Sequence, residues 1–210
     1  GALTIGAPLG LSCAIYLSEY SGKRMKMLLK PAIELLAGIP SVVFGFLGVI
    51  YIVPLVRNYL GGSGFSIIST SLVLGVMILP TIISISFDAL VSVPKTYREA
   101  SAAMGATKWQ TIYKVIIPSA KSGILASFIL GMGRAIGETM AVIMIAGNAL
   151  KIPTSLLDPL RTLTGNIALE LAYATGDHRL ALFSTAVVLM IIIMALNYIA
   201  NFGIKRKIAK

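Results

Sequence analysis

Residues 94–118, PKTYREASAAMGATKWQTIYKVIIP, are the stretch of sequence that decides the fold. The segment is charged and rich in helix-forming residues, and apolar runs long enough to cross a bilayer flank it on both sides. Between membrane spans, such a segment is expected to be presented to a soluble partner. The alternative is a basic amphipathic hairpin that only lies among the lipid headgroups, since such segments are common at membrane surfaces.

The composition identifies an all-α polytopic membrane protein. Of the 210 residues, 57% are hydrophobic and only 12% are charged, and the mean hydropathy is +0.89. A soluble domain of this length needs many more charged residues to cover its surface. The single cysteine, Cys13, lies in an apolar run without a partner, so we expect no disulfide, no metal cluster and no cofactor.

Five spans are expected, because about 20 apolar residues suffice to cross the hydrocarbon core. The second contains Pro40 and Ser41 in the sequence GIPS, where proline removes a backbone hydrogen bond that the serine hydroxyl partly replaces. This helix break is either an unwound turn that lines a transport path or a plain kink. Pro80 interrupts the third span. The expected spans are residues 1–17, 32–56, 65–90, 124–146 and 180–204.

The lysines and arginines predict the orientation. Thirteen of the 18 fall on one side of the expected spans, four fall on the other, and Arg134 lies within a span. The positive-inside rule places the majority side, with residues 94–118 and the tail at 205–210, in the cytoplasm. The net charge of +10 therefore reflects the topology of the chain in the membrane. Membrane lipid is an expected partner, and nucleic acid is not.

Two short helices are predicted within residues 94–118. Pro94 suits the first turn of a helix, and Gly105 stands where a helix C-terminus favours glycine. Thr107, followed three residues later by Gln110, has the form of a capping box that starts a second helix. The two helices should therefore be joined by a tight bend at residues 103–106.

The same segment resembles the EAA motif of the permease subunits of ABC importers. That motif reads EAA, three residues, Gly, nine residues and I-x-L-P. Here the matching residues are Glu99-Ala100-Ser101, Gly105 and Val115-Ile116-Ile117-Pro118. In that family the two short helices dock onto an ATP-binding subunit and transmit its closure to the spans. The resemblance thus implies a role in coupling to the ATPase for Arg98, Glu99, Ala100, Gly105 and Trp109.

Three further stretches resemble the permeases of phosphate importers, and one of them looks more like the PstC-type subunit than its PstA-type partner. They are LLAGIPSVVFG at 35–45, GRAIGETMAVIMIAGN at 133–148 and LLDPLRTLTGNIALELAYA at 156–174. The resemblance implies a type I ABC importer permease fold, formed as one transmembrane domain over residues 1–210. Family members have six spans, and this chain begins abruptly in an apolar run. We therefore expect the chain to be truncated at its N-terminus.

The chain carries no GxxxxGK[ST] motif, so it is expected to be a transporter subunit rather than an enzyme. Energy would then enter through partners. The resemblance implies a second related permease (PstA-type), two ATP-binding subunits (PstB-type) and an external phosphate-binding protein (PstS-type). The outer loop at 148–179 is expected to hold a short helix within residues 158–174 that meets the substrate-delivering protein.

Arg134 is the candidate for the substrate path. It lies about ten residues, or roughly 15 Å, into the fourth expected span, where a charge costs about 2.5–3.5 kcal/mol on insertion scales. A guanidinium group matches phosphate oxygens in a bidentate way. Glu138 lies four residues on, on the same helical face, where it could neutralise Arg134 or accept a hydrogen bond from protonated phosphate. The alternative is an ion pair that only fastens helices, with Gly133 and Gly137 allowing close packing beside it.

The alternatives are an importer of a different solute, an intramembrane enzyme and a structural membrane anchor. An importer of another oxyanion (molybdate- or sulfate-like) or of another small solute fits the same features. An intramembrane enzyme would need a Ser/His pair, paired aspartates or a metal cluster, whereas the only histidine, His178, lies in a loop. A purely structural anchor explains neither Arg134 nor the long gapped motif.

Overall fold

The computed structural model describes residues 1–208, and the surroundings of side chains up to Tyr198. The side chains of the basic tail at 205–210 therefore lie outside the described residues. The helical elements, with η marking π-helical segments, are α1 (Ala2–Ile15), η1 (Tyr16–Tyr20), α2 (Lys23–Ala37), α3 (Ser41–Leu47), η2 (Gly48–Ile52), α4 (Val53–Leu60), α5 (Ile67–Val91), α6 (Lys95–Ala103), α7 (Lys108–Thr111), η3 (Ile112–Ile116), α8 (Ile117–Ser119), α9 (Lys121–Gly137), α10 (Met140–Ile145), α11 (Leu163–Glu170) and α12 (Gly176–Ile208).

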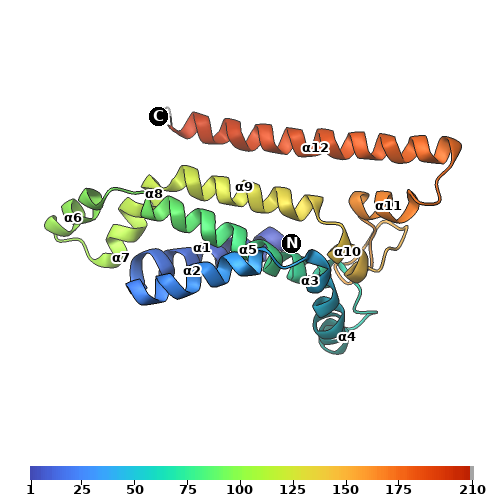
Figure 1. Ribbon diagram of the computed structural model, residues 1–210, viewed down its shortest axis with the longest axis horizontal. Coiled ribbons are helices and arrows are strands. Elements are labelled where there is room, and N and C mark those ends of the chain that lie inside the picture. Colours follow the sequence, from blue (N-terminus) through green and yellow to red (C-terminus); the bar gives the residue numbers. More distant parts are fainter. Residues whose placement is uncertain (209–210) are drawn as a thin grey trace.

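The long helices lie side by side along the long axis of the molecule (Figure 1). Helix α5 is at the centre and packs against α1, α2 and α9, while α12 packs on α9. The short helices α6 and α7 lie at one end, and α10 and α11 lie at the other. The predicted all-α membrane fold is confirmed, and within residues 1–208 the only β-type pairing is one bridge between Gly147 and Leu160.

Four helical segments are long and apolar enough to cross a membrane, and the number is five if a bent pair of helices is counted as one span. The bent pair consists of the helix at Lys108–Ser119 and α9, whose directions differ by 69°. That number agrees with the five spans expected, although the second and fourth expected spans have different bounds in the structure. The four single segments are Ala2–Tyr20, Ser41–Leu60, Ile67–Val91 and Gly176–Tyr198.

The second expected span, residues 32–56, does not form a single helix. Helix α2 ends at Ala37, and a new helix starts at Ser41 and continues to Leu60. Between them Pro40 has extended backbone angles (φ −57°, ψ 136°), and its carbonyl accepts a hydrogen bond from the Val43 N–H at 3.0 Å. A proline ring clashes with the preceding helical turn, so the chain is interrupted on its N-terminal side.

Pro80, by contrast, lies inside α5 without interrupting it, which corrects the expected interruption of the third span. Prolines are tolerated in membrane helices because neighbouring groups satisfy the backbone atoms that they free. The fourth expected span, 124–146, is also corrected. Helix α9 ends at Gly137, and α10 is a separate short helix after a break at residues 138–139.

Small residues set the close approach of α1 to α5. A side-chain carbon added at Gly6 would lie 2.8 Å from the Ile78 side chain and 2.9 Å from the Gly75 carbonyl oxygen. One added at Gly10 would lie 2.7 Å from the Ile82 side chain. Between helices in lipid the attraction comes from van der Waals contact, so interfaces of small residues are the expected solution.

Helix α9 joins α5 through a polar contact as well as through packing. The hydroxyls of Ser86 and Ser127 form a hydrogen bond of 2.8 Å, and both side chains are fully buried. Leu90, Ile116 and Ile124 form an apolar cluster just below this contact. The cluster joins the end of α5, the helix at Lys108–Ser119 and the start of α9, and so it supports the polar segment between these spans.

Candidate functional site

The polar segment between α5 and α9 forms two helices with a tight turn, as predicted. Gly105 has φ +78°, which favours glycine. The capping box is present: the Gln110 N–H donates to the Thr107 hydroxyl at 3.3 Å, and the Thr107 N–H donates to the Gln110 amide oxygen at 2.9 Å. The Ser101 and Thr111 hydroxyls join the two helices at 2.9 Å. We call residues 94–119 the coupling loop.

The coupling loop lies at one end of the molecule (Figure 1), and several of its large apolar side chains are exposed. Met104 is 88% exposed and Trp109 is 63% exposed, and the Trp109 ring stacks on Tyr113 with centroids 6.4 Å apart. Glu99, Ala100 and Gly105 are also exposed. An apolar patch with a polar rim is typical of a surface that binds another protein.

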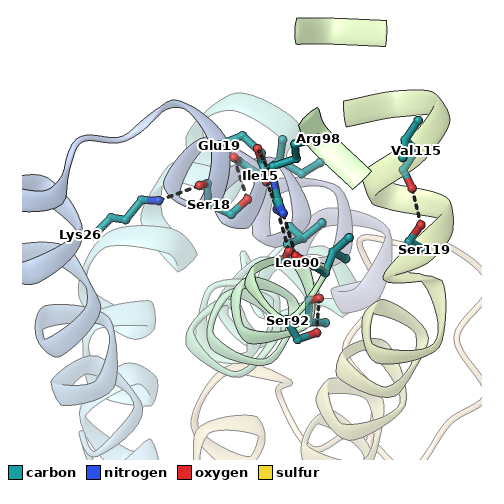
Figure 2. A network of polar contacts seen from close by, with 11 residues as sticks. Ile15, Ser18, Glu19, Lys26, Leu90, Ser92, Arg98, Val115 and Ser119 are labelled. Carbon is teal, nitrogen blue, oxygen red and sulfur yellow. Dashed lines mark hydrogen bonds and ion pairs between the residues drawn. The ribbon is translucent and has the colours of Figure 1, made fainter. Parts of the chain in front are cut away.

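Arg98 does not belong to that exposed surface. Its guanidinium group is directed into the protein, where it forms an ion pair of 2.7 Å with Glu19 (Figure 2). It also donates to the carbonyl oxygens of Val93 at 2.8 Å and Leu90 at 3.0 Å. Glu19 was missed in the sequence, although it is the single acidic residue within the basic stretch 18–30.

Arg134 lies partly buried in α9 and contacts two other helices. Its guanidinium group lies 3.4 Å from the Thr81 hydroxyl of α5 and 3.5 Å from the Ala37 carbonyl oxygen. Ala37 is the last residue of α2, where helical carbonyl groups lack a partner within the helix. Arg134 is thereby brought to the helix break at Pro40. Thr81 was not identified from the sequence. It could have been found as a polar residue that directly follows a proline within an apolar span.

Glu138 does not share a helical face with Arg134, which corrects the expectation from their spacing. It follows the last residue of α9 and has an extended backbone (φ −68°, ψ 130°). Its carboxylate accepts a hydrogen bond from the Ala141 N–H at 3.1 Å, and its carbonyl accepts one from the Thr164 hydroxyl at 3.1 Å. Among the ion pairs of the described side chains, none joins Glu138 to Arg134.

The expected close packing at Gly133 and Gly137 is also absent within residues 1–198. A side-chain carbon added at either glycine would meet no atom within 4 Å. The close approach occurs instead at Gly131, where such a carbon would lie 3.0 Å from Ile82. The face of α9 that carries Gly133 and Gly137 is therefore open.

The outer loop is held by polar contacts and contains the short helix that was predicted, α11. Arg161 forms an ion pair of 2.7 Å with Glu170 and donates to the Asn148 carbonyl at 3.2 Å. Asp158 accepts hydrogen bonds from the Thr154 N–H and hydroxyl and from the Ser155 N–H. These bonds, and more weakly the charge of Lys151, lower the pKa of the Asp158 carboxyl.

Residues 6–210 match a sequence family described as the binding-protein-dependent transport system inner membrane component. The chain belongs to this family. It is therefore a permease subunit of ABC importers and a multi-pass protein of the cytoplasmic membrane, as the resemblance implied. Such permeases work with ATP-binding and substrate-binding partners.

Curated relatives of the permease include a probable ABC transporter permease protein, YqgH, of Bacillus subtilis. It is 43% identical over 204 residues, which cover 94% of this chain and 66% of the relative. The phosphate transport system permease proteins PstC of Xylella fastidiosa and Mesorhizobium japonicum are 32% and 33% identical. Those matches cover 98% of this chain and 69% of each relative. The permease thus spans about two thirds of the length of these proteins.

Solved structures support the fold of the permease. The MetNI methionine ABC transporter, in an inward-facing conformation, matches with a TM-score of 0.71 and 20% identity, over 98% of this chain and 87% of the other. An amino acid ABC transporter matches with a TM-score of 0.62 and 19% identity, over 98% and 86%. The expected fold of type I ABC importer permeases is confirmed.

Proposed function

We propose that this permease is the PstC-type subunit of an importer that uses ATP to move inorganic phosphate across the cytoplasmic membrane. The observation that carries the proposal is the surroundings of Arg134. Its contacts are to neutral oxygen atoms of Thr81 and Ala37, at 3.4 and 3.5 Å, and no carboxylate among the described side chains pairs with it. A cation inside a helix bundle that lacks an anion is suited to bind one in transit.

Phosphate oxygens would replace these two long contacts with shorter, charge-assisted hydrogen bonds. Loss of the Arg134 contact would also release the last carbonyl of α2, next to the break at Pro40 and Ser41. We therefore place this break on the substrate path, where its backbone polar groups face the ion rather than lipid. The names of the PstC relatives, similar over 98% of this chain, support phosphate as that ion.

Glu138 has a different place in the proposal from Arg134. Its side chain lines an open groove toward the outer end of α9, together with Arg161, Thr162 and Thr164. We place it at the entrance to the path, where its carboxylate would accept a hydrogen bond from protonated phosphate. Fully ionised sulfate offers no such donor. The substitution Glu138→Gln should therefore weaken the discrimination between phosphate and sulfate.

The partners follow from the two ends of the molecule. The exposed surface of the coupling loop, with Glu99, Ala100, Gly105 and Trp109, would bind a PstB-type ATP-binding subunit. The outer loop around α11 would receive a PstS-type phosphate-binding protein. The open face of α9 at Gly133 and Gly137 would meet a PstA-type permease. We propose the whole chain, residues 1–210, as one permease domain.

The test is phosphate uptake by vesicles that contain the full complex. Arg134→Ala should abolish uptake, and Arg134→Lys should lower it, because an ammonium group keeps the charge but loses the planar fork. Arg24→Ala is the matched control, since it removes one guanidinium group from an exposed position at the start of α2. Retained uptake in Arg134→Ala would contradict the proposal. Sulfate or molybdate uptake in place of phosphate would favour an importer of another oxyanion.

A further inference from the structure

Three elements meet at the buried pair of Glu19 and Arg98. Glu19 comes from η1 at the end of α1, Arg98 comes from α6, and the Leu90 carbonyl comes from the last turn of α5 (Figure 2). The Val93 carbonyl comes from the chain just after α5. The Glu19 side chain is only 9% exposed, and the Arg98 side chain is 27% exposed. This junction lies beneath the coupling loop, away from the surface proposed to bind the ATP-binding subunit.

Glu19 lies within the π-helical segment η1, which continues α1. The Ser21 N–H donates to the Tyr16 carbonyl at 3.0 Å, five residues back rather than four. The Ser18 carbonyl, in the last turn before the helix ends, accepts a hydrogen bond from the Lys26 ammonium at 2.7 Å. Single π-helical turns occur frequently at functional sites. Here the turn places a carboxylate opposite Arg98.

Arg98 makes two kinds of contact at once. It pairs with Glu19, and it satisfies carbonyls at the end of α5 that have no partner within that helix. A positive charge at a helix C-terminus is also favourable to the helix dipole. When one member of a largely buried ion pair is removed, the other remains as an uncompensated charge, so both positions are sensitive.

Besides the bond from Arg98 to the end of α5, two separate contacts join helix α6 to the chain that leads into α9 and to the end of α1. Ser101 bonds to Thr111 at 2.9 Å, in the helix that leads into α9. Arg98 bonds to Glu19, at the end of α1. The first contact joins residues that are 10 positions apart in the sequence, and the second joins residues that are 79 positions apart. A displacement of α6 therefore has a direct route to α9 through the chain, and reaches α1 through the ion pair.

We propose that Glu19 and Arg98 are positioning residues that make the inner end of α1 move together with α6 when the coupling loop is displaced. The proposal rests on the coupling role assigned to the loop under the proposed function. Arg98 then acts inside the permease rather than as a contact to the ATP-binding subunit. Without the pair, α6 still moves α9, but α1 is left behind.

The direct test measures the distance between α1 and α6 in the full complex. Spin labels are attached at Leu9→Cys and Lys95→Cys, both exposed positions, in a chain whose single cysteine is replaced by Cys13→Ser. With Glu19 intact, we expect the same narrow distance distribution with and without ATP. In Glu19→Gln, the distribution should broaden and shift when ATP binds. An unchanged distribution in both states would overturn the proposal.

The second measurement is the number of phosphate ions taken up for each ATP hydrolysed. Glu19→Gln and Arg98→Met should each lower this ratio about fivefold or more, within the range of typical coupling free energies between sites. The double variant should show about the effect of one single variant, because the two residues act as a pair. A role in folding alone would lower the amount of complex but not this ratio.

Asp88→Asn provides the matched control. Asp88 pairs with Lys30 at 3.0 Å and also joins two helices, α5 and α2, but the side chains of Asp88 and Lys30 are 61% and 44% exposed. Exposed ion pairs contribute little, so the ratio should stay unchanged. An equal loss in Asp88→Asn would also overturn the proposal. If Glu19→Gln prevents assembly, Glu19→Asp, which keeps the charge but shortens the side chain so that it no longer reaches Arg98, replaces it in both measurements.

The two proposals can fail separately. The spin-label distances do not require phosphate. A complex that moves α1 with α6 but takes up no phosphate would contradict the proposed substrate and leave the role of the Glu19–Arg98 pair in place. A complex that takes up phosphate, and in which both single variants keep the normal ratio of phosphate to ATP, would contradict the role of the Glu19–Arg98 pair and leave the proposed substrate in place.

Discussion

Gly105 is the residue at which the coupling loop depends most directly on backbone conformation. Its φ of +78° is unfavourable for any residue with a side chain, while an added side-chain carbon would meet no atom within 4 Å. A substitution there acts through the backbone and not through a steric clash. The turn that separates α6 from α7 is therefore the part that would change.

We predict that Gly105→Val leaves the spans assembled but uncouples ATP hydrolysis from uptake, because a left-handed conformation costs a branched residue about 1–2 kcal/mol or more. The measurement is uptake and ATPase activity in the reconstituted complex. Gly22→Ala is the control, since its added carbon also meets open space but its φ is −71°. Normal coupling in Gly105→Val would contradict the prediction.

Asp158 gives the outer loop a dependence on pH. Hydrogen bonds from Thr154 and Ser155 hold the pKa of its carboxyl below the ordinary value of 3.8. The carboxylate therefore stabilises the turn fully above about pH 4, and this stabilisation is lost as the pH falls through the lowered pKa. Amide protection at Thr154 and Ser155, corrected for the intrinsic pH dependence of exchange, should fall in acid. In Asp158→Asn, the acid-dependent part of the loss should disappear.

The helices themselves are held together where small residues allow contact. Gly6→Val should push α1 from α5, because the added atoms meet the Ile78 side chain and the backbone oxygen of Gly75. We expect a loss of about 1–3 kcal/mol, as for other overpacked interiors, seen as a lower unfolding temperature of the purified permease. Gly133→Ala, at an open position of α9, should leave that temperature unchanged. Similar shifts in both would count against the packing argument.

Local signals in the sequence predicted the elements that depend on residues a few positions apart. The capping box of Thr107 and Gln110 and the turn at Gly105 are examples, since each involves one turn of chain. The end of α9 was not predictable in this way. Glu138 leaves the helix where its carbonyl accepts a bond from Thr164, 26 residues later. The Glu19–Arg98 contact joins residues 79 positions apart, and no spacing rule reaches that far.

At the scale of the whole molecule, the lysines and arginines predict that the two ends lie on opposite sides of the membrane. Met104 in the coupling loop is 88% exposed and Ile152 in the outer loop is 89% exposed. In a Cys13→Ser chain, a membrane-impermeant thiol reagent should label Ile152→Cys in intact cells. It should label Met104→Cys only after the membrane is opened. The reverse pattern would overturn the orientation predicted from the lysines and arginines.

The side of each loop stays a prediction from charge. The number of spans followed from hydropathy, because hydropathy is a property of single segments. The arrangement of the helices did not. Arg134 contacts Thr81 and Ala37, two positions that no segment-level pattern connects with it. For the proposed substrate path, the charge of Arg134 could be found in the sequence, but the atoms around that charge could not.

The bend of 69° between the helix at Lys108–Ser119 and α9 has a mechanical consequence. A push along the axis of the first helix has only a small component along the axis of the second. The larger component of the force is directed across the axis of α9, so the bend turns an axial push into a sideways rotation of α9. Pressure on the coupling loop would swing the far end of α9, with Arg134 on it, sideways rather than drive the helix lengthwise through the bilayer.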